Sequence, residues 1–382
     1  MRKKYLLAPG PVQAPPEVLA ELAKPLIHHR TEQFENIFFQ TQSLLKELFM
    51  TKLPVITFAA SGTGAMEAAV VNFHSEADEV LVIRGGKFGE RWGNISEAYK
   101  LKVHYIDIKW GSGIKPEEIE KYLNINKNIK SVMIQYVETS TAAMYDIENI
   151  AKVVTKTNTL LIVDAISALG VVPLPADDWK IDVIVGGSQK SLMLPPGLSF
   201  LWCSQKALSV SEKSNLPKFY FNIKKELKAL EKKTTAWTPA ISLIGALNTS
   251  LTMMKSYGWE NLFKKNKKLM TAIHNGLKAL NIELFSSSPA VSVTAGAVPQ
   301  NVDGVKLVKD MKDIHAVTIA GGQDELKGKI FRVGTLGYVD SSDIIVFFAA
   351  LEACLKSQNY KFNLGAGLSA AEKVLYSEEN NA

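Results

Sequence analysis

The stretch Gly186-Gly-Ser-Gln-Lys190-Ser-Leu192 decides the fold of this chain. The residues before it, Asp182-Val-Ile-Val185, are mostly apolar and β-branched, which predicts a short buried strand. Two glycines end that strand, so Lys190 is expected in a tight turn at a strand end, where open α/β sheets bind ligands. A lysine held there can form a Schiff base with a carbonyl cofactor if burial and a cationic neighbour lower its pKa. A solvated loop lysine is the alternative interpretation.

A carboxylate interrupts the apolar run Thr159-Leu-Leu-Ile-Val-Asp164, which otherwise resembles a buried strand of a parallel sheet. An acid at the end of such a strand costs free energy unless it is paired. Pyridoxal phosphate needs such a partner, because an aspartate on its pyridine nitrogen keeps that nitrogen protonated. Asp164 could instead cap a helix. Its place after one strand-like run, with Lys190 after another, favours the cofactor interpretation.

The segment Ser61-Gly-Thr-Gly64 follows an expected strand at 54–58 and opens an expected helix at 65–73. Glycines let the backbone approach a ligand, and the free N–H groups of a first helical turn bind an anion. A phosphate group would suit this site, although a plain Ser/Gly helix cap explains the same residues.

Strands alternate with helices over residues 54–203, which predicts an α/β fold with a mostly parallel, doubly wound sheet. We expect an N-terminal arm over residues 1–20, extended because of its prolines. A large cofactor-binding domain is expected over 21–257, and a bridging helix with a smaller C-terminal α+β domain over 258–382. The small domain should contain strands near 290–293, 316–319 and 329–333.

Taken together, these features resemble the class V, fold-type I pyridoxal-phosphate aminotransferases, in the group of alanine–glyoxylate and serine–glyoxylate aminotransferases. The ordered set of motifs covers nearly the whole chain and is specific, although each motif alone is weak. The matching motifs are Ala8-Pro-Gly-Pro11, Ser61-Gly-Thr-Gly64, Glu138-Thr-Ser-Thr141, Val163-Asp164, Ser188-Gln-Lys190 and Arg332-Val-Gly334. The resemblance implies a seven-stranded sheet, pyridoxal 5'-phosphate as cofactor, and a homodimer with shared active sites.

The resemblance also implies roles for individual residues. Lys190 and Asp164 would be the catalytic pair, and Arg332 with Gly10 would bind the substrate. The implied cofactor-binding residues are Ser61, Gly62, Thr63, Gly64, Phe88, Thr139, Asp164, Ile166, Gln189, Lys190, Thr235 and Thr238. For Phe88 a plain core aromatic is the alternative, and for Arg332 a structural salt bridge.

Three positions bear on how the family pattern applies to this chain. The family commonly has glycine where this chain has Ala142, and animal relatives carry a tyrosine at Thr235. Thr238 precedes Pro239 and an expected helix, which makes a second anion site. In the family this segment reaches across the dimer, so Thr238 is expected at the phosphate bound by the neighbouring subunit.

The implied reaction moves an amino group from alanine or serine to glyoxylate or pyruvate. The pair His29-Arg30 resembles one that phosphoserine aminotransferases use, which leaves a phosphoserine or aspartate aminotransferase as the alternative. The stretch Gly85-Gly-Lys-Phe-Gly89 leaves a nucleotide-binding dehydrogenase open, although it lacks the G-x-G-x-x-G spacing. A non-catalytic binding protein is also open, but it would leave the combination of Lys190 and Asp164 unexplained.

Composition places further bounds on the function. The 382 residues carry a net charge of +6 with scattered lysines, so we expect no nucleic-acid partner. Cys203 and Cys354 show no metal-binding spacing, which favours no metal and a reducing cytoplasm. Pro9 and Pro11 interrupt any apolar leader, and the apolar stretches are too short to span a membrane.

Overall fold

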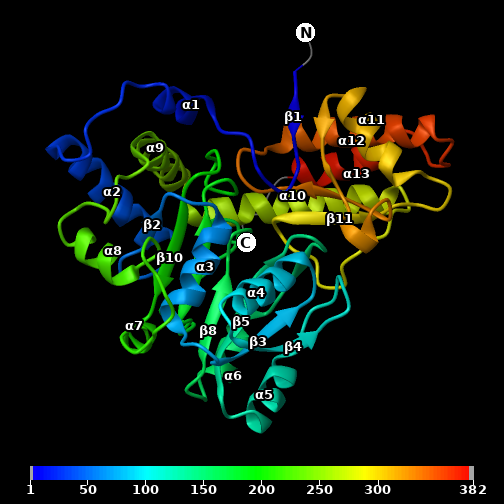
Figure 1. The fold of residues 1–382 in the computed structure, drawn as a ribbon. Helices are drawn as coiled ribbons and strands as arrows, with labels where there is room; N and C mark the ends of the chain where they lie inside the picture. Colours follow the sequence, from blue (N-terminus) through cyan, green and yellow to red (C-terminus); the bar gives the residue numbers. More distant parts are fainter. Residues whose placement is uncertain (1–2, 378–382) are drawn as a thin grey trace.

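The structure, a computed structural model, describes residues 3–377 and contains one seven-stranded sheet of order β2-β10-β9-β8-β5-β3-β4 (Figure 1). Strand β10 runs antiparallel to both of its neighbours, and the other neighbouring pairs are parallel. The mostly parallel, seven-stranded sheet expected from the sequence is therefore confirmed. Its strands are β2 Ile56–Phe58, β3 Glu79–Arg84, β4 Lys102–Asp107, β5 Ile129–Gln135, β8 Leu160–Asp164, β9 Val183–Gly187 and β10 Ser199–Cys203.

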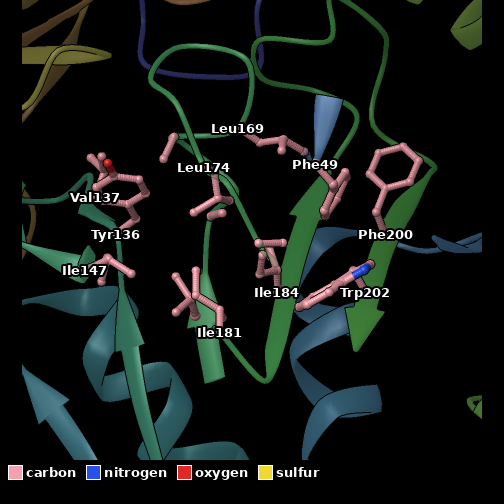
Figure 2. Close-up of a cluster of buried hydrophobic side chains, with 14 of the residues drawn as sticks. Phe49, Tyr136, Val137, Ile147, Leu169, Leu174, Ile181, Ile184, Phe200 and Trp202 are labelled. Atoms are coloured by element: carbon pink, nitrogen blue, oxygen red, sulfur yellow. The ribbon is translucent and has the colours of Figure 1, made fainter. Parts of the chain in front are cut away.

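Apolar side chains alternate between the two faces of this sheet, so each face has its own core. In β9, Ile184 packs on one face with Phe200 and Trp202 (Figure 2), whereas Val183 and Val185 pack on the other. Because helices cover both faces, the central strands are buried throughout and read as continuous apolar runs. Burying one such side chain stabilises the fold by about 1.5–3 kcal/mol.

Helices supply the other half of each core. The core that contains Ile184 includes side chains from α2 Glu32–Leu48, α5 Pro116–Ile125, α6 Ile147–Val154 and α9 Ile241–Tyr257. The helices on the opposite face are α3 Gly62–Phe73, α4 Lys87–Ala98, α7 Gln205–Ser211 and α8 Ile223–Leu230. No helix within residues 3–377 is both long and apolar enough to span a lipid bilayer.

A separate apolar core lies beside the long helix α10, which passes above the sheet in the view of Figure 1. Its helices are α10 Trp259–Ala279, α11 Gly304–Asp313, α12 Ser341–Ser357 and α13 Ala366–Leu375. A three-stranded sheet of order β11-β14-β13 accompanies them, with β11 Val293–Ala297, β14 Ile330–Gly334 and β13 Ala320–Gly321. The remaining short elements are β6 Val137–Glu138, β7 Ala143–Met144, β12 Val317–Thr318 and the 3₁₀ turn Asp324–Leu326.

The expected strand at 54–58 is shorter, Ile56–Phe58, and the expected helix at 65–73 starts earlier, at Gly62. Two further expectations from the sequence are wrong. The strand expected at 290–293 lies at Val293–Ala297, because the Ala290 N–H bonds the Ala142 carbonyl (2.9 Å) and the ladder to β14 starts at Val293. The arm is extended only in part, since β1 (Tyr5–Leu6) pairs with β12 but Pro16–Leu22 forms helix α1. Proline at the first helical position has no N–H to lose and favours that start.

The division into an arm, a large domain and a small domain stays a prediction. The outermost residues of its first and last ranges, 1–2 and 378–382, lie outside the described part of the chain. The third core, built from α10 to α13 with Leu7 from the arm, is the feature that favours a separate C-terminal domain.

Candidate active site

Three neighbouring parts of the main sheet bring polar side chains to one edge. Asp164 is the last residue of β8, Lys190 lies three residues beyond β9, and Thr139 follows β6, just beyond β5. Strands β5, β8 and β9 are parallel neighbours, so their carboxyl ends meet at the same edge. Residues far apart in the sequence therefore surround one space.

That space is a cavity of about 320 Å³. Ten of the fourteen candidate site residues line it, namely Gly10, Ser61, Gly62, Thr63, Phe88, Thr139, Asp164, Ile166, Gln189 and Lys190. The cavity also has five lining residues that were not among the candidate site residues, namely Pro11, Arg91, Val137, Ser167 and Pro196.

Lys190 is nearly buried, and its Nζ donates a hydrogen bond to the Pro9 carbonyl. The pKa of Lys190 is lowered to about 8, mainly by burial; Asp164 opposes this shift, and the cations Arg332 and Arg91 contribute to it. An amine with this pKa is neutral far more often near pH 8 than an ordinary lysine, so it is a competent nucleophile and proton acceptor. Gly10 lies directly against it, with φ of +110°.

Asp164 is also buried, and its Oδ1 accepts a hydrogen bond from the Ile166 N–H at 2.8 Å. The pKa of Asp164 is raised to about 7, mainly by burial; the Ile166 N–H and the cations Lys190 and Arg91 oppose this shift, and Glu138 contributes to it. Its Oδ2 accepts no hydrogen bond from residues 3–377. A buried acid with a free oxygen is ready to hold a cationic or N–H group.

Helix α3 points its first turn at the same cavity through Ser61, Gly62 and Thr63. The Ser61 side chain does not cap the helix, so N–H groups of the first turn are left for a ligand. Any side chain at Gly62 would collide with Ile166, which explains the glycine. The side-chain oxygen of Gln189, Oε1, is buried nearby without a hydrogen-bond partner among the described residues.

Phe88 is placed by a buried carboxylate at the start of helix α4. Glu138 Oε2 accepts hydrogen bonds from the backbone N–H groups of Phe88 (3.1 Å) and Gly89 (3.0 Å). Burial raises the pKa of Glu138, although the hydrogen bonds that it accepts oppose that shift. The glycines before Phe88 therefore lie at the start of a helix whose first N–H groups bond to a carboxylate.

Arg332 in β14 lies beside the cavity rather than in its lining. Its Nε and Nη2 donate to the Gly321 carbonyl (3.1 and 2.8 Å), and its Nη1 donates to the Thr139 carbonyl (2.8 Å). A guanidinium has five N–H donors, so two remain for an anion. Both contacts are to backbone carbonyls, so the salt bridge that was the alternative interpretation does not form within the described residues.

The turn that contains Thr139 keeps the shape that glycine would favour. Thr139 Oγ1 shares a hydrogen bond with Ser167 Oγ at 2.7 Å. Ala142, where the family commonly has glycine, has φ of +56° and so adopts the left-handed conformation. Alanine at position 142 therefore adopts the left-handed conformation that glycine favours.

Comparison with known proteins decides the family. The sequence profile described as Aminotransferase class-V matches residues 4–323. The chain is a class V aminotransferase. It is 41% identical over 381 residues to "Soluble hydrogenase, small subunit" of Synechococcus sp., covering 98% of each chain. It is 31% identical over 386 residues to serine–glyoxylate aminotransferase of Methylorubrum extorquens, covering 98% of this chain and 96% of the other.

The fold comparison agrees with the family. The crystal structure of ureidoglycine–glyoxylate aminotransferase from Bacillus subtilis superimposes with a TM-score of 0.94 at 28% identity and covers 99% of both chains. The class V aminotransferase resemblance, the fold-type I architecture and the transaminase class are therefore confirmed, and the family depends on pyridoxal 5'-phosphate. The dehydrogenase and the non-catalytic binding protein are set aside by this family membership.

The cavity of this class V aminotransferase fits pyridoxal phosphate on its own chemistry. The first turn of α3 offers N–H groups to a phosphate. Lys190 offers an amine of lowered pKa to a carbonyl, and Asp164 offers a free carboxylate oxygen to a ring nitrogen. Each part of the cofactor thus has a complementary group.

Three candidate residues lie elsewhere in this aminotransferase. Gly64 lies within α3, where a side chain would meet Ala60 and Phe221, so its glycine serves packing. Thr235 and Thr238 line a separate small cavity of about 10 Å³ together with Glu226 and Trp237. Within one chain they do not contact the Lys190 cavity, and their role at a neighbouring subunit stays a prediction.

The pair His29-Arg30 precedes helix α2 and does not line the cavity of this aminotransferase. Arg30 is exposed. Within one chain, the pair is therefore not placed to bind a phosphorylated or acidic donor.

The most informative residue that the sequence did not single out is Arg91. It lies on α4 three residues after Phe88, a spacing that puts two side chains on one helix face. That spacing was the only available signal, and it also describes an ordinary solvated arginine on an amphipathic helix.

Proposed function

We propose that this chain transfers an amino group from alanine or serine to glyoxylate or pyruvate. The observation that carries the proposal is the convergence of Lys190, Asp164 and Arg332 around one cavity. Its volume of about 320 Å³ is at the low end of ligand sites, about 300–1,000 Å³, and it would have to hold the cofactor beside the substrate, which favours a small donor. The names of two similar proteins include glyoxylate, which supports that acceptor.

When bound, the cofactor would supply an electron-withdrawing ring that weakens the C–H bond at the donor α-carbon. Lys190 would remove that α-proton at Nζ, and in the half-reaction with the acceptor it would return a proton to the corresponding carbon. Its pKa of about 8 suits proton transfer in both directions near neutral pH. Asp164 would hold the proton on the ring nitrogen. Phe88 would cover one ring face and exclude water.

Arg332 would orient the donor by its α-carboxylate. Hydrogen bonds to Gly321 and Thr139 hold the guanidinium in place before substrate arrives. The two remaining N–H groups match the two oxygens of a carboxylate. Because donor and acceptor both carry this carboxylate, one arginine would serve both half-reactions.

A steady-state panel tests the substrate assignment. Purified enzyme loaded with cofactor is assayed with alanine, serine, aspartate and phosphoserine against glyoxylate, pyruvate and 2-oxoglutarate. We expect the highest kcat/KM for alanine or serine with glyoxylate or pyruvate. Turnover only with phosphoserine or aspartate would refute the neutral donor, and Arg30→Ala would then show whether that pair binds the acidic group.

The proposed homodimer with shared sites rests on the segment that carries Thr235 and Thr238. Beside it, Phe219 is 73% exposed and stacks on Trp237 with ring centroids 5.1 Å apart. An exposed phenylalanine that stacks on a half-buried tryptophan, next to two threonines that do not line the Lys190 cavity of their own chain, suits a contact with a second copy.

Thr238→Val should weaken binding of the cofactor and make it depend more steeply on protein concentration. Thr271→Val is the control, because that hydroxyl bonds the Lys267 carbonyl of its own helix at 2.8 Å. Sedimentation that shows a fully active monomer with normal cofactor affinity would refute the shared site.

A further inference from the structure

Arg91 is held at the cavity from two sides. Its Nη1 donates a hydrogen bond to Thr63 Oγ1 at 3.1 Å, and its guanidinium carbon lies 4.8 Å from the centroid of the Phe88 ring. Arg91 also lines the cavity itself. A hydrogen bond together with a cation–π contact fixes a side chain that would otherwise sample many rotamers.

The charge of Arg91 is not neutralised by the protein. No ion pair joins Arg91 to a carboxylate within residues 3–377, and neighbouring Glu90 pairs with Lys87. Arg84 is the contrasting case, because it forms two hydrogen bonds with Asp107 (2.6 and 3.0 Å) and stacks on Tyr105. An ordered arginine that faces a ligand cavity without an acidic partner is suited to an anionic ligand.

Thr63 contacts Arg91 and belongs to the first turn of α3, the part of the cavity that would bind the cofactor phosphate in the proposed function. It lies in the first turn of α3, and its side chain lines the cavity. A threonine hydroxyl has one hydrogen to donate and two lone pairs to accept. Because Arg91 occupies a lone pair, the hydroxyl hydrogen is free to be donated to another acceptor.

We propose that Arg91 strengthens binding of the cofactor phosphate by acting through Thr63. The guanidinium orients the hydroxyl so that its hydrogen points to the phosphate, and it polarises the O–H bond so that it donates more strongly. Arg91 is in this sense a positioning residue. The proposal rests on the proposed function, because it assumes that pyridoxal phosphate is the ligand.

The test compares pyridoxal phosphate with pyridoxal, which lacks the phosphate. Binding of each to the cofactor-free enzyme is measured by absorbance and tryptophan fluorescence. Arg91→Gln should weaken pyridoxal phosphate binding about ten- to hundredfold, the range for a hydrogen bond to a charged group, and leave pyridoxal binding unchanged. Arg91→Lys should recover part of the loss, and Arg84→Gln, the matched control, should bind both ligands normally.

A double-mutant cycle tests the route through the hydroxyl. Thr63→Val should cause a similar selective loss, and the Thr63→Val, Arg91→Gln double variant should lose little more than either single variant. Fully additive losses would overturn the role of Thr63. Thr63→Val also keeps the proposal testable if Arg91→Gln fails to fold, which thermal melting will show.

The outcomes separate the two proposals. Wild-type binding of pyridoxal phosphate by Arg91→Gln, or equal weakening of both ligands, would overturn the role of Arg91 and leave the proposed function intact. Failure of the wild-type enzyme to bind pyridoxal phosphate would overturn the proposed function together with this inference.

Discussion

Replacing Gly10 by alanine should damage catalysis far more than stability. A Cβ at this position would lie 2.5 Å from both Nζ and Cδ of Lys190, whereas ordinary contact begins near 3.4 Å. The lysine chain must therefore move by about 0.9 Å. A displacement of about 1 Å at a reacting group can cost about 100-fold in rate.

The stability cost of Gly10→Ala is expected to be small, because the clash is with the far end of a flexible side chain. What remains is the positive φ of +110°, a sparsely populated conformation that costs about 1–3 kcal/mol for a residue with a Cβ. Gly365→Ala is the matched control, since Gly365 has φ of +86° and no heavy atom within 4 Å of its added Cβ. That variant should share the modest loss of stability and keep full turnover.

The assay is kcat/KM for the best donor, measured beside thermal melting of both variants. We expect a loss of about 100-fold for Gly10→Ala and less than twofold for Gly365→Ala. Equal activity of the two folded variants would show that Lys190 tolerates the shift, and the argument from its placement would fail.

Four further outcomes are expected. Lys190→Ala should lose about 10²–10⁴-fold in kcat while still binding cofactor, and near-normal turnover would exclude it as the proton carrier. Asp164→Asn should bind cofactor about ten- to hundredfold less tightly, and unchanged affinity and kcat would remove it from the site. Arg332→Lys should raise KM about tenfold for donor and acceptor alike, and a change for one substrate only would contradict carboxylate binding. In the cofactor-free enzyme, the rate at which Lys190 reacts with a small aldehyde should rise with pH through about pH 8 and then level off, because the amine loses its proton in that range. A rate that keeps rising to pH 10 would indicate an ordinary lysine.

The sequence predicted that Asp164 and Lys190 meet at one edge of the sheet, because all parallel strands follow the same rule. Asp164 and Lys190 each follow an apolar run, and the carboxyl ends of parallel strands must meet at one edge. The sequence could not predict which strands are neighbours. The pairing of β8 with β9, which puts Asp164 opposite Val185, depends on how the helices pack on both faces.

The sequence could not predict groups that act through their backbone or through contacts between distant segments. The Pro9 carbonyl that accepts the hydrogen bond of Lys190 belongs to a segment 181 residues away, and every residue has a carbonyl. The sequence does not distinguish Arg91 from a solvated helix cation, because its contact with Thr63 joins two different helices. Helix α1 was missed because Pro15-Pro16 was taken to extend the chain, although Pro16 favours a helix start.

Burial explains why cofactor binding and folding should be coupled in this chain. Asp164 and Lys190 both lie in a low-dielectric site, where the pKa of the acid rises to about 7 and that of the amine falls to about 8. Each shift means that burial disfavours the charged form of the group in the folded chain. In the proposed function, a protonated ring nitrogen would favour the charged form of Asp164 again, and Lys190 would react as the neutral amine. A ligand that meets both conditions binds only the folded state, so at 100 times its Kd it adds about 2.7 kcal/mol to the free energy of unfolding.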